Sequence, residues 1–215
     1  MRKLYGYFRS SAAFRARIAL NLKGLDYEGA NIHLVKNGGE PFAPEYRALN
    51  PQSLVPVLQE DELTLTQSLA IIEYLDEVYP EPAFLPKTAA QRARVRSLAL
   101  MVACEIHPLN NLRVLRYLVK DLKVTEAQKD EWYRHWVTSG LEPLDTRLAN
   151  DPATGKFCHG DMPGLADICL VPQLANARRF NICLDAFPAL VRIEQNCMAL
   201  KPFQDAAPSA QPDAE

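Results

Sequence analysis

KLYGYFRSSAAFRARIAL, residues 3–20, is the stretch of sequence that decides the fold. Its opening residues, 3–8, form a short β-prone run, which predicts a strand. Ser10 or Ser11 can then cap a helix that continues through Asn21. The stretch therefore predicts a strand that runs directly into a helix, with hydroxyl groups at the junction.

The segments that follow predict a small α/β domain. Tyr27–Leu34 has strand character. Val57–Gln59 and Leu63–Leu65 flank a tight turn, which is typical of a β-hairpin. Gln67-Ser68 then opens an amphipathic helix. The predicted order is β-α-β, a connecting segment, then β-β-α.

A cluster of prolines marks a domain boundary, because strand signals almost vanish beyond Pro80, Pro82 and Pro86. Two capping boxes of the S/T-x-x-E/Q type, at residues 88–91 and 125–128, each begin a long helical pattern. We therefore expect a first domain over residues 1–82, an all-helical domain over 87–205 with further helices near 165–180 and 187–199, and a frayed tail over 206–215.

Composition excludes several classes of function. Lys and Arg number 24 against 26 Asp and Glu, so no general field draws the chain to nucleic acid or to an anionic membrane. Charges interrupt every apolar run before the roughly 18 residues that a membrane helix requires. The first residues lack the apolar core of a secretion signal. These features predict a cytoplasmic protein.

The cysteines and histidines predict neither disulfides nor a metal site. Five cysteines are odd in number, form no C-x-x-C pair and lie mostly in apolar surroundings, so we interpret them as reduced core residues. The four histidines have no partner at metal-ligand spacing. We therefore expect no bound metal.

The junction of strand and helix has the chemistry of a thiolate site. Hydroxyls, free N–H groups and the positive end of a helix dipole favour a bound thiolate at Ser10 and Ser11. Arg9, Arg15 and Arg17 add positive charge nearby. Ordinary helix capping beside a solvated basic face is the simpler interpretation, and these residues alone leave both open.

Two further segments could hold a small peptide. A cis bond before Pro56 would leave the N–H and C=O of Val55 free to pair, whereas a trans turn proline at an edge strand is the simpler interpretation. Gln67 and Ser68 offer an amide, a hydroxyl and unpaired helix N–H groups, which suit a carboxylate. Ordinary capping remains the alternative there.

Together these motifs resemble the glutathione transferases. YFRSSAAFRARIAL, residues 7–20, resembles the S-S-C-x-x-R-x-R-I-A-L signature of the zeta class. The resemblance covers about residues 1 to 205 and continues through ALNPQSLVP at 48–56, QSLAIIEYL at 67–75, IHPLNNL at 106–112 and LADICLVPQ at 165–173. HPLNN at 107–111 and ARRF at 177–180 are most similar to bacterial maleylpyruvate isomerases.

The resemblance implies a fold of the α/β + all-α class, with a thioredoxin-like domain that binds glutathione and a helical domain that completes the substrate pocket. It also implies a homodimer. By position, it assigns the thiol and helix-start motif to Ser10, Ser11 and Arg15, the glutathione peptide to Gln52 and Val55, and the γ-glutamyl end to Gln67 and Ser68. It assigns further glutathione contacts to His107, Asn111 and Arg113, and the substrate's carboxylates to Arg9 and Arg179.

Three positions depart from the pattern of the class. Ala12 replaces the class cysteine, so steps that need a protein thiol are not expected, although maleylpyruvate isomerases of this kind also lack it. Pro41 stands where relatives often have a glutamine that contacts glutathione. Gly164 stands where a helix usually has a Ser or Thr cap, a replacement with a small energetic cost.

The activity implied is a glutathione-dependent cis-trans isomerisation of a maleyl keto acid, either maleylpyruvate or maleylacetoacetate, in aromatic catabolism. A general glutathione transferase and a non-catalytic ligand-binding protein are the alternatives. The sequence also leaves open whether Ser10, Ser11 or only N–H groups hold the thiolate, and whether Arg178 or Arg179 faces the substrate.

Overall fold

The strand predicted at the start of the chain is present at the centre of a four-stranded sheet. β1 (Arg2–Gly6) pairs in parallel with β2 (Glu28–Asn31) and antiparallel with β3 (Val57–Glu60). β3 also pairs antiparallel with β4 (Leu63–Thr66), so the strand order is β2-β1-β3-β4. The predicted β-α-β then β-β-α order is confirmed.

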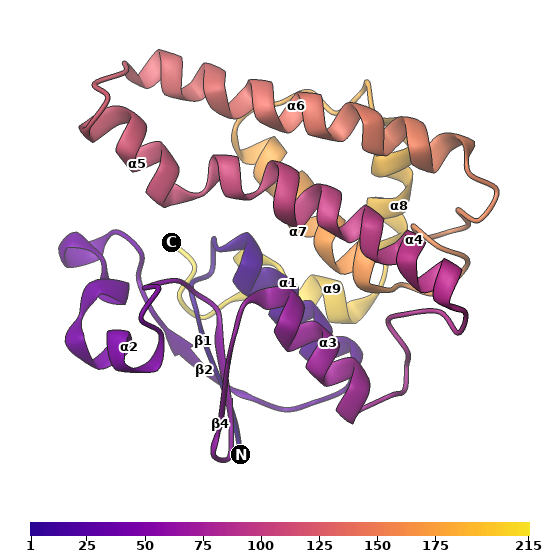
Figure 1. Ribbon diagram of the computed structural model, residues 1–215, viewed down its shortest axis with the longest axis horizontal. Helices are drawn as coiled ribbons and strands as arrows, with labels where there is room; N and C mark the ends of the chain where they lie inside the picture. The colour runs from indigo at the N-terminus through magenta and orange to yellow at the C-terminus, as the bar shows by residue number, and fades with distance from the viewer. The chain divides into compact units, whose positions relative to one another are not determined.

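The computed structural model describes residues 1–215, except for the side chain of Asn37. The chain divides into two compact units (Figure 1). The first comprises Met1–Ala83 together with Met198–Glu215, and the second comprises Phe84–Cys197. Among the described residues, no helix is long and apolar enough to cross a membrane.

Helices of the first unit pack around α1 (Ser11–Leu22), which contacts α3 (Ser68–Val78) and α9 (Lys201–Ala206). The fully buried ammonium group of Lys23, just after α1, lies 2.8 Å from a carboxylate oxygen of Asp76 on α3. The connecting segment contains a short helix that the sequence did not predict, α2 (Pro44–Leu49). Its first residue is a proline, whose fixed φ suits the first turn.

Two details of the predicted sheet are wrong. The strand expected over Tyr27–Leu34 is shorter, because the carboxylate of Glu40 accepts the main-chain N–H of His33 at 2.6 Å and takes the place of a strand partner. Pro56 was expected on an edge strand, but β3 lies between two strands. The proline is accommodated because it precedes Val57, the first paired residue.

The second unit is helical, as predicted. α4 (Ala89–Leu100) contacts α7 (Leu165–Arg179), and α5 (Leu112–Lys120) lies beside α6 (Glu126–Asn150) in Figure 1. A π-helical turn over Met101–Ile106 continues α4, and α8 (Pro188–Met198) ends at the boundary of the unit. Thr125 and Gln128 form the complete capping box predicted for α6.

The end of the chain differs from the frayed tail expected over residues 206–215. Nε of Arg17 donates to the carbonyl oxygen of Ala206 at 2.9 Å, and the N–H of Phe8 donates to the Asp213 carboxylate at 3.1 Å. Residues 198–215 accordingly group with the first unit, whereas residues 87–205 were expected to form one domain. These long-range hydrogen bonds leave no local signal in the sequence.

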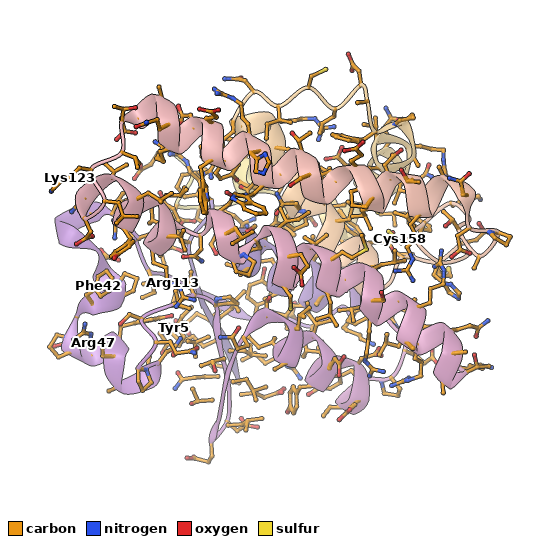
Figure 2. All side chains as sticks on the ribbon, turned by 45° about the horizontal axis from the view of Figure 1, so that its top comes forward. Tyr5, Phe42, Arg47, Arg113, Lys123 and Cys158 are labelled. Atoms are coloured by element: carbon orange, nitrogen blue, oxygen red, sulfur yellow. The ribbon has the colours of Figure 1, made fainter. Side chains whose placement is uncertain are left out.

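A buried carboxylate compensates for the missing cap of α7. Asp167 is 1% exposed, and it accepts the N–H of Cys158 at 2.8 Å and that of Gly164 at 2.9 Å. Burial raises the pKa of Asp167, while the donated hydrogen bonds oppose the rise. Asp167 thereby fixes the start of α7 and the loop that carries Cys158 (Figure 2).

Asp167→Ala is expected to lower the free energy of unfolding by about 2–4 kcal/mol, because the buried N–H of Cys158 and the partly buried N–H of Gly164 lose their acceptor. Asp167→Asn keeps one acceptor oxygen and should lose less. Urea unfolding followed by circular dichroism measures both changes. Asp205→Ala is the control, since its exposed pair with Lys201 should contribute less than about 1 kcal/mol. Equal stability of Asp167→Ala and the native protein would contradict the assignment.

Candidate functional site

The turn between β1 and α1 presents the hydroxyl predicted there. Ser10 is the N-cap of α1, and its Oγ accepts the N–H of Ala13 at 3.2 Å. The capping interpretation is therefore correct for Ser10. A hydroxyl that accepts one hydrogen bond still has its own hydrogen to donate. Ser11 follows in the first helical turn and is buried.

Arg9, in the same turn, extends an exposed guanidinium. Its Cζ lies 4.8 Å from the ring centroid of Phe8, and Nη2 lies 3.4 Å from the main-chain oxygen of Glu215. Gly6 allows this junction to be tight, because a Cβ there would lie 3.2 Å from the Cβ of Ala13. An exposed cation thus lies in the same turn as the Ser10 hydroxyl.

The start of α3 brings four predicted residues together in two pairs. Nε2 of Gln67 donates to Oε1 of Gln52 at 2.8 Å. The buried guanidinium of Arg15 places Nη1 3.5 Å from Oγ of Ser68. Gln67 is the N-cap of α3 with φ of 68°, and its side chain does not cap the helix. The positive end of α3 is therefore accompanied by a buried cation and two side-chain amides.

Val55 presents main-chain groups beside these amides. The Val55-Pro56 bond is cis, so the simpler trans interpretation is wrong. Among the residues that the structure describes, the N–H and C=O of Val55 have no hydrogen-bond partner. Both groups are thus available to pair with an extended peptide.

Asn50 organises this loop, a role that the sequence patterns did not predict. It is 2% exposed, its Nδ2 donates to the carbonyl oxygen of Leu54 at 2.8 Å, and its Oδ1 accepts the N–H of Gln52 at 3.0 Å. The hydroxyl of Tyr46 donates to the same Leu54 oxygen at 2.7 Å. The Asn-Pro pair at residues 50–51 was a turn signal that could have identified it.

Three predicted residues lie in the second unit, near the start of α5. His107 precedes a 3₁₀ turn over Pro108–Asn110. Asn111 is the N-cap of α5, and its Oδ1 accepts the N–H of Arg113 at 3.1 Å. The side chain of Arg113 is exposed in the first turn of that helix (Figure 2). Capping thus accounts for Asn111, while Arg113 presents an exposed cation.

The two adjacent arginines at the end of α7 have different surroundings. Arg178 forms an ion pair with Glu194 of α8. Cζ of Arg179 lies 5.0 Å from the ring centroid of Phe180, which stacks on Tyr133 at 3.5 Å between centroids. Burial raises the pKa of Tyr133, and the positive charge of Arg179 opposes the rise. No carboxylate pairs with Arg179 among the described residues.

Comparison with known proteins identifies the family. Residues 4–83 match the family described as glutathione S-transferase, N-terminal domain. The chain is 50% identical over 211 residues to a probable maleylacetoacetate isomerase of Vibrio cholerae, covering 98% of this chain and 97% of the relative. It is 47% identical to a maleylpyruvate isomerase of a Ralstonia species, covering 99% of each chain.

Solved structures agree with these sequences. A maleylpyruvate isomerase described as a bacterial glutathione S-transferase of the zeta class matches with a TM-score of 0.96 and 46% identity, over 99% of this chain and 100% of that one. The chain belongs to the zeta class of glutathione transferases. A maleylacetoacetate isomerase from Anaeromyxobacter dehalogenans, with bound dicarboxyethyl glutathione and citrate, matches with a TM-score of 0.87 and 44% identity, over 100% of this chain and 98% of that one.

This zeta-class chain has no thiol at the position of the class cysteine, Ala12. Its five cysteines are free, and Cys158, Cys169 and Cys197 are buried as predicted. Burial raises the pKa of the Cys158 and Cys197 thiols, which keeps them protonated. The other cysteines, Cys104 and Cys183, are exposed, so the prediction of a core position is wrong for them. No cluster among the described residues has the ligands for a metal ion.

Asn50→Ala is expected to lower the free energy of unfolding by about 1–3 kcal/mol, because the N–H of Gln52 and the carbonyl of Leu54 each lose a partly buried hydrogen bond. Chemical denaturation measures the change. Asn150→Ala is the matched control, since it removes an exposed hydrogen bond to Thr146 within one helix and should change stability by about 0.5 kcal/mol or less. A loss no larger than the control's would remove Asn50 from its organising role.

Proposed function

We propose that the protein is a glutathione-dependent cis-trans isomerase that converts a maleyl keto acid, maleylpyruvate or maleylacetoacetate, to its fumaryl isomer in aromatic catabolism. Full-length identity to relatives with these activities supports the proposal. The structural observation that carries it is the start of α1, where the Ser10 hydroxyl and helix N–H groups meet beside Arg9. That arrangement suits a catalytic thiolate rather than a protein nucleophile.

The residues of the first unit fit glutathione. An extended peptide can pair with the free N–H and C=O of Val55. A γ-glutamyl carboxylate suits the start of α3, where Ser68, the helix dipole and the buried Arg15 favour negative charge. Gln52 and Gln67 can divide their amide hydrogen bonds between each other and the peptide. Relatives with bound glutathione support the same cofactor.

The energy barrier to rotation about a C=C bond is prohibitive. Isomerisation therefore needs a nucleophile, such as a thiolate, that adds to the double bond and then leaves. Bound glutathione supplies a thiolate that adds reversibly to the conjugated cis double bond, which rotates as a single bond before the thiolate leaves. We assign Ser10 to hold the sulfur through a charge-directed hydrogen bond, with Ser11 and helix N–H groups as further donors. Positive charge around the site also stabilises the charge that develops on the substrate's carbonyl oxygen.

Arg9 and Arg179 are the proposed ligands of the substrate's carboxylates. A guanidinium binds a carboxylate through two parallel hydrogen bonds, which fixes both its position and its orientation. Arg179 is the better of the adjacent pair, because Arg178 already has a carboxylate partner in Glu194. A relative with bound dicarboxyethyl glutathione is consistent with addition of sulfur to an enedioate.

We further propose that His107, Asn111 and Arg113 contact glutathione, and that the protein works as a cytoplasmic homodimer. The class resemblance supports the contacts and the dimer. Free cysteines suit a reducing compartment. Sedimentation of the purified protein tests the dimer, and a monomer across micromolar concentrations would contradict it.

An absorbance assay of maleylpyruvate and maleylacetoacetate, with and without glutathione, tests the activity. We expect conversion to the fumaryl isomer only with glutathione, and full recovery of free glutathione when the reaction ends. Turnover that is indifferent to glutathione would overturn the mechanism. Stoichiometric loss of glutathione would instead identify a conjugating transferase.

Arg179→Met is expected to lower kcat/KM by an amount equivalent to about 2–3 kcal/mol of lost transition-state stabilisation. Glutathione affinity should be largely retained, because only the substrate loses a carboxylate ligand. Arg178→Met is the matched control on the same helix end. It should affect stability, through Glu194, more than kcat/KM. Steady-state kinetics and glutathione titration measure the two effects. Native activity in Arg179→Met would exclude Arg179 from the substrate site.

Ser10→Ala is expected to lower kcat/KM at neutral pH by roughly 10- to 100-fold, because the thiolate loses a donor. Loss of that donor raises the pKa of the bound thiol toward the ordinary thiol value of about 8.5, so the pH–rate profile shifts to higher pH. Ser11→Ala should shift it less. Thr88→Ala removes a cap from α4 and is the control for lost capping. An unshifted profile in Ser10→Ala would assign the thiolate to other donors.

A further inference from the structure

The turn proposed to hold the thiolate is fixed from outside by a buried guanidinium. Nη2 of Arg17 donates to the carbonyl oxygen of Phe8 at 3.1 Å, and Nη1 lies 3.5 Å from that of Tyr7. Within the turn, the N–H of Ser10 donates to the same Tyr7 oxygen at 2.9 Å. The path of the chain into Ser10 therefore depends on Arg17.

The same guanidinium holds the C-terminal segment. Nε of Arg17 donates to the carbonyl oxygen of Ala206, the last residue of α9, at 2.9 Å. Arg17 is 4% exposed, and burial lowers its pKa to about 10, while electrostatic interactions with Tyr27 and Asp213 oppose the fall. Its donors thus join the turn at residues 7–8 to the end of α9.

Asp213 completes this arrangement from the C-terminal side. Its Oδ2 accepts the main-chain N–H of Phe8 at 3.1 Å. Phe8 is therefore held at both main-chain groups, at its N–H by Asp213 and at its carbonyl by Arg17. We propose that Asp213 is a positioning residue for the thiol site, which fixes the Phe8-Arg9-Ser10 turn so that the Ser10 hydroxyl and the first N–H groups of α1 converge on sulfur.

The positioning role of Asp213 rests on the proposed function of Ser10, and it extends that function to a residue far away in the sequence. Donors stabilise a thiolate only if they point at it, and small misplacements at a reacting centre reduce rates strongly. The charged and titratable groups around the turn are Tyr7, Arg9, Arg17, Tyr27, His33, Asp213 and Glu215.

Loss of the Asp213 charge and loss of its hydrogen bond to Phe8 predict opposite shifts in the pKa of the bound thiol, so the positioning role can be tested. The negative charge of Asp213 by itself disfavours a neighbouring thiolate, so loss of that charge alone would lower the pKa of the bound thiol. Loss of positioning would raise it, because donors no longer point at sulfur. Asp213→Asn retains an acceptor for Phe8 without the charge, whereas Asp213→Ala retains neither.

The experiment measures the thiolate absorbance of enzyme-bound glutathione across pH, together with kcat and KM, for Asp213→Ala, Asp213→Asn and the control Asp205→Ala. Asp205 lies on α9, and its exposed carboxylate pairs with Lys201 on the same helix. We expect Asp213→Ala to raise the thiol pKa and to lower kcat/KM about tenfold. The kcat/KM of Asp213→Asn should stay within about twofold of the native value, and so should that of the control.

Either of two outcomes would overturn the proposal: native behaviour in Asp213→Ala, or the same lowered thiol pKa in both Asp213 variants. Circular dichroism of each variant separates these results from unfolding. If the native protein itself binds no glutathione, the proposed function fails. If it binds and turns over normally but the Asp213 variants match it, only the positioning role fails.

Discussion

A buried guanidinium must satisfy its donors with acceptors brought to it, and in this protein the acceptors are main-chain carbonyls. Arg17 binds the carbonyls of Tyr7, Phe8 and Ala206, so its burial requires the turn after β1 and the end of α9 to meet. An unpaired guanidinium at this depth would cost several kcal/mol. The geometry of the Ser10 cap follows from that requirement.

Much of the fold is predictable because its signals are local. The hairpin, the Thr125 capping box and the helix at residues 165–179 each depend on residues close in sequence. The path of residues 206–215 and the interior position of β3 depend on partners far away in the chain. Local patterns carry no information about such partners, so the sequence could not predict them.

The residues of the candidate site likewise divide into those that local sequence predicts and those that it does not. Ser10 as a cap and Gln67-Ser68 at a helix start were predictable from their neighbours. The isomer of the Val55-Pro56 bond was not, because either form suits the local sequence. Arg178 and Arg179 are adjacent, and only the position of Glu194 on another helix distinguishes them. Adjacent residues of one type therefore need a structure before their roles can be assigned.

The first unit is discontinuous in sequence, and this affects the order in which a newly made chain can fold. Residues 1–83 leave the ribosome first, yet the segment over 198–215 that completes their unit is synthesised after the whole helical unit. Until Asp213 has emerged, the N–H of Phe8 has no carboxylate and Arg17 lacks one of its carbonyls. In a nascent chain the turn over residues 7–10 therefore lacks these two contacts until the segment over 198–215 has been made.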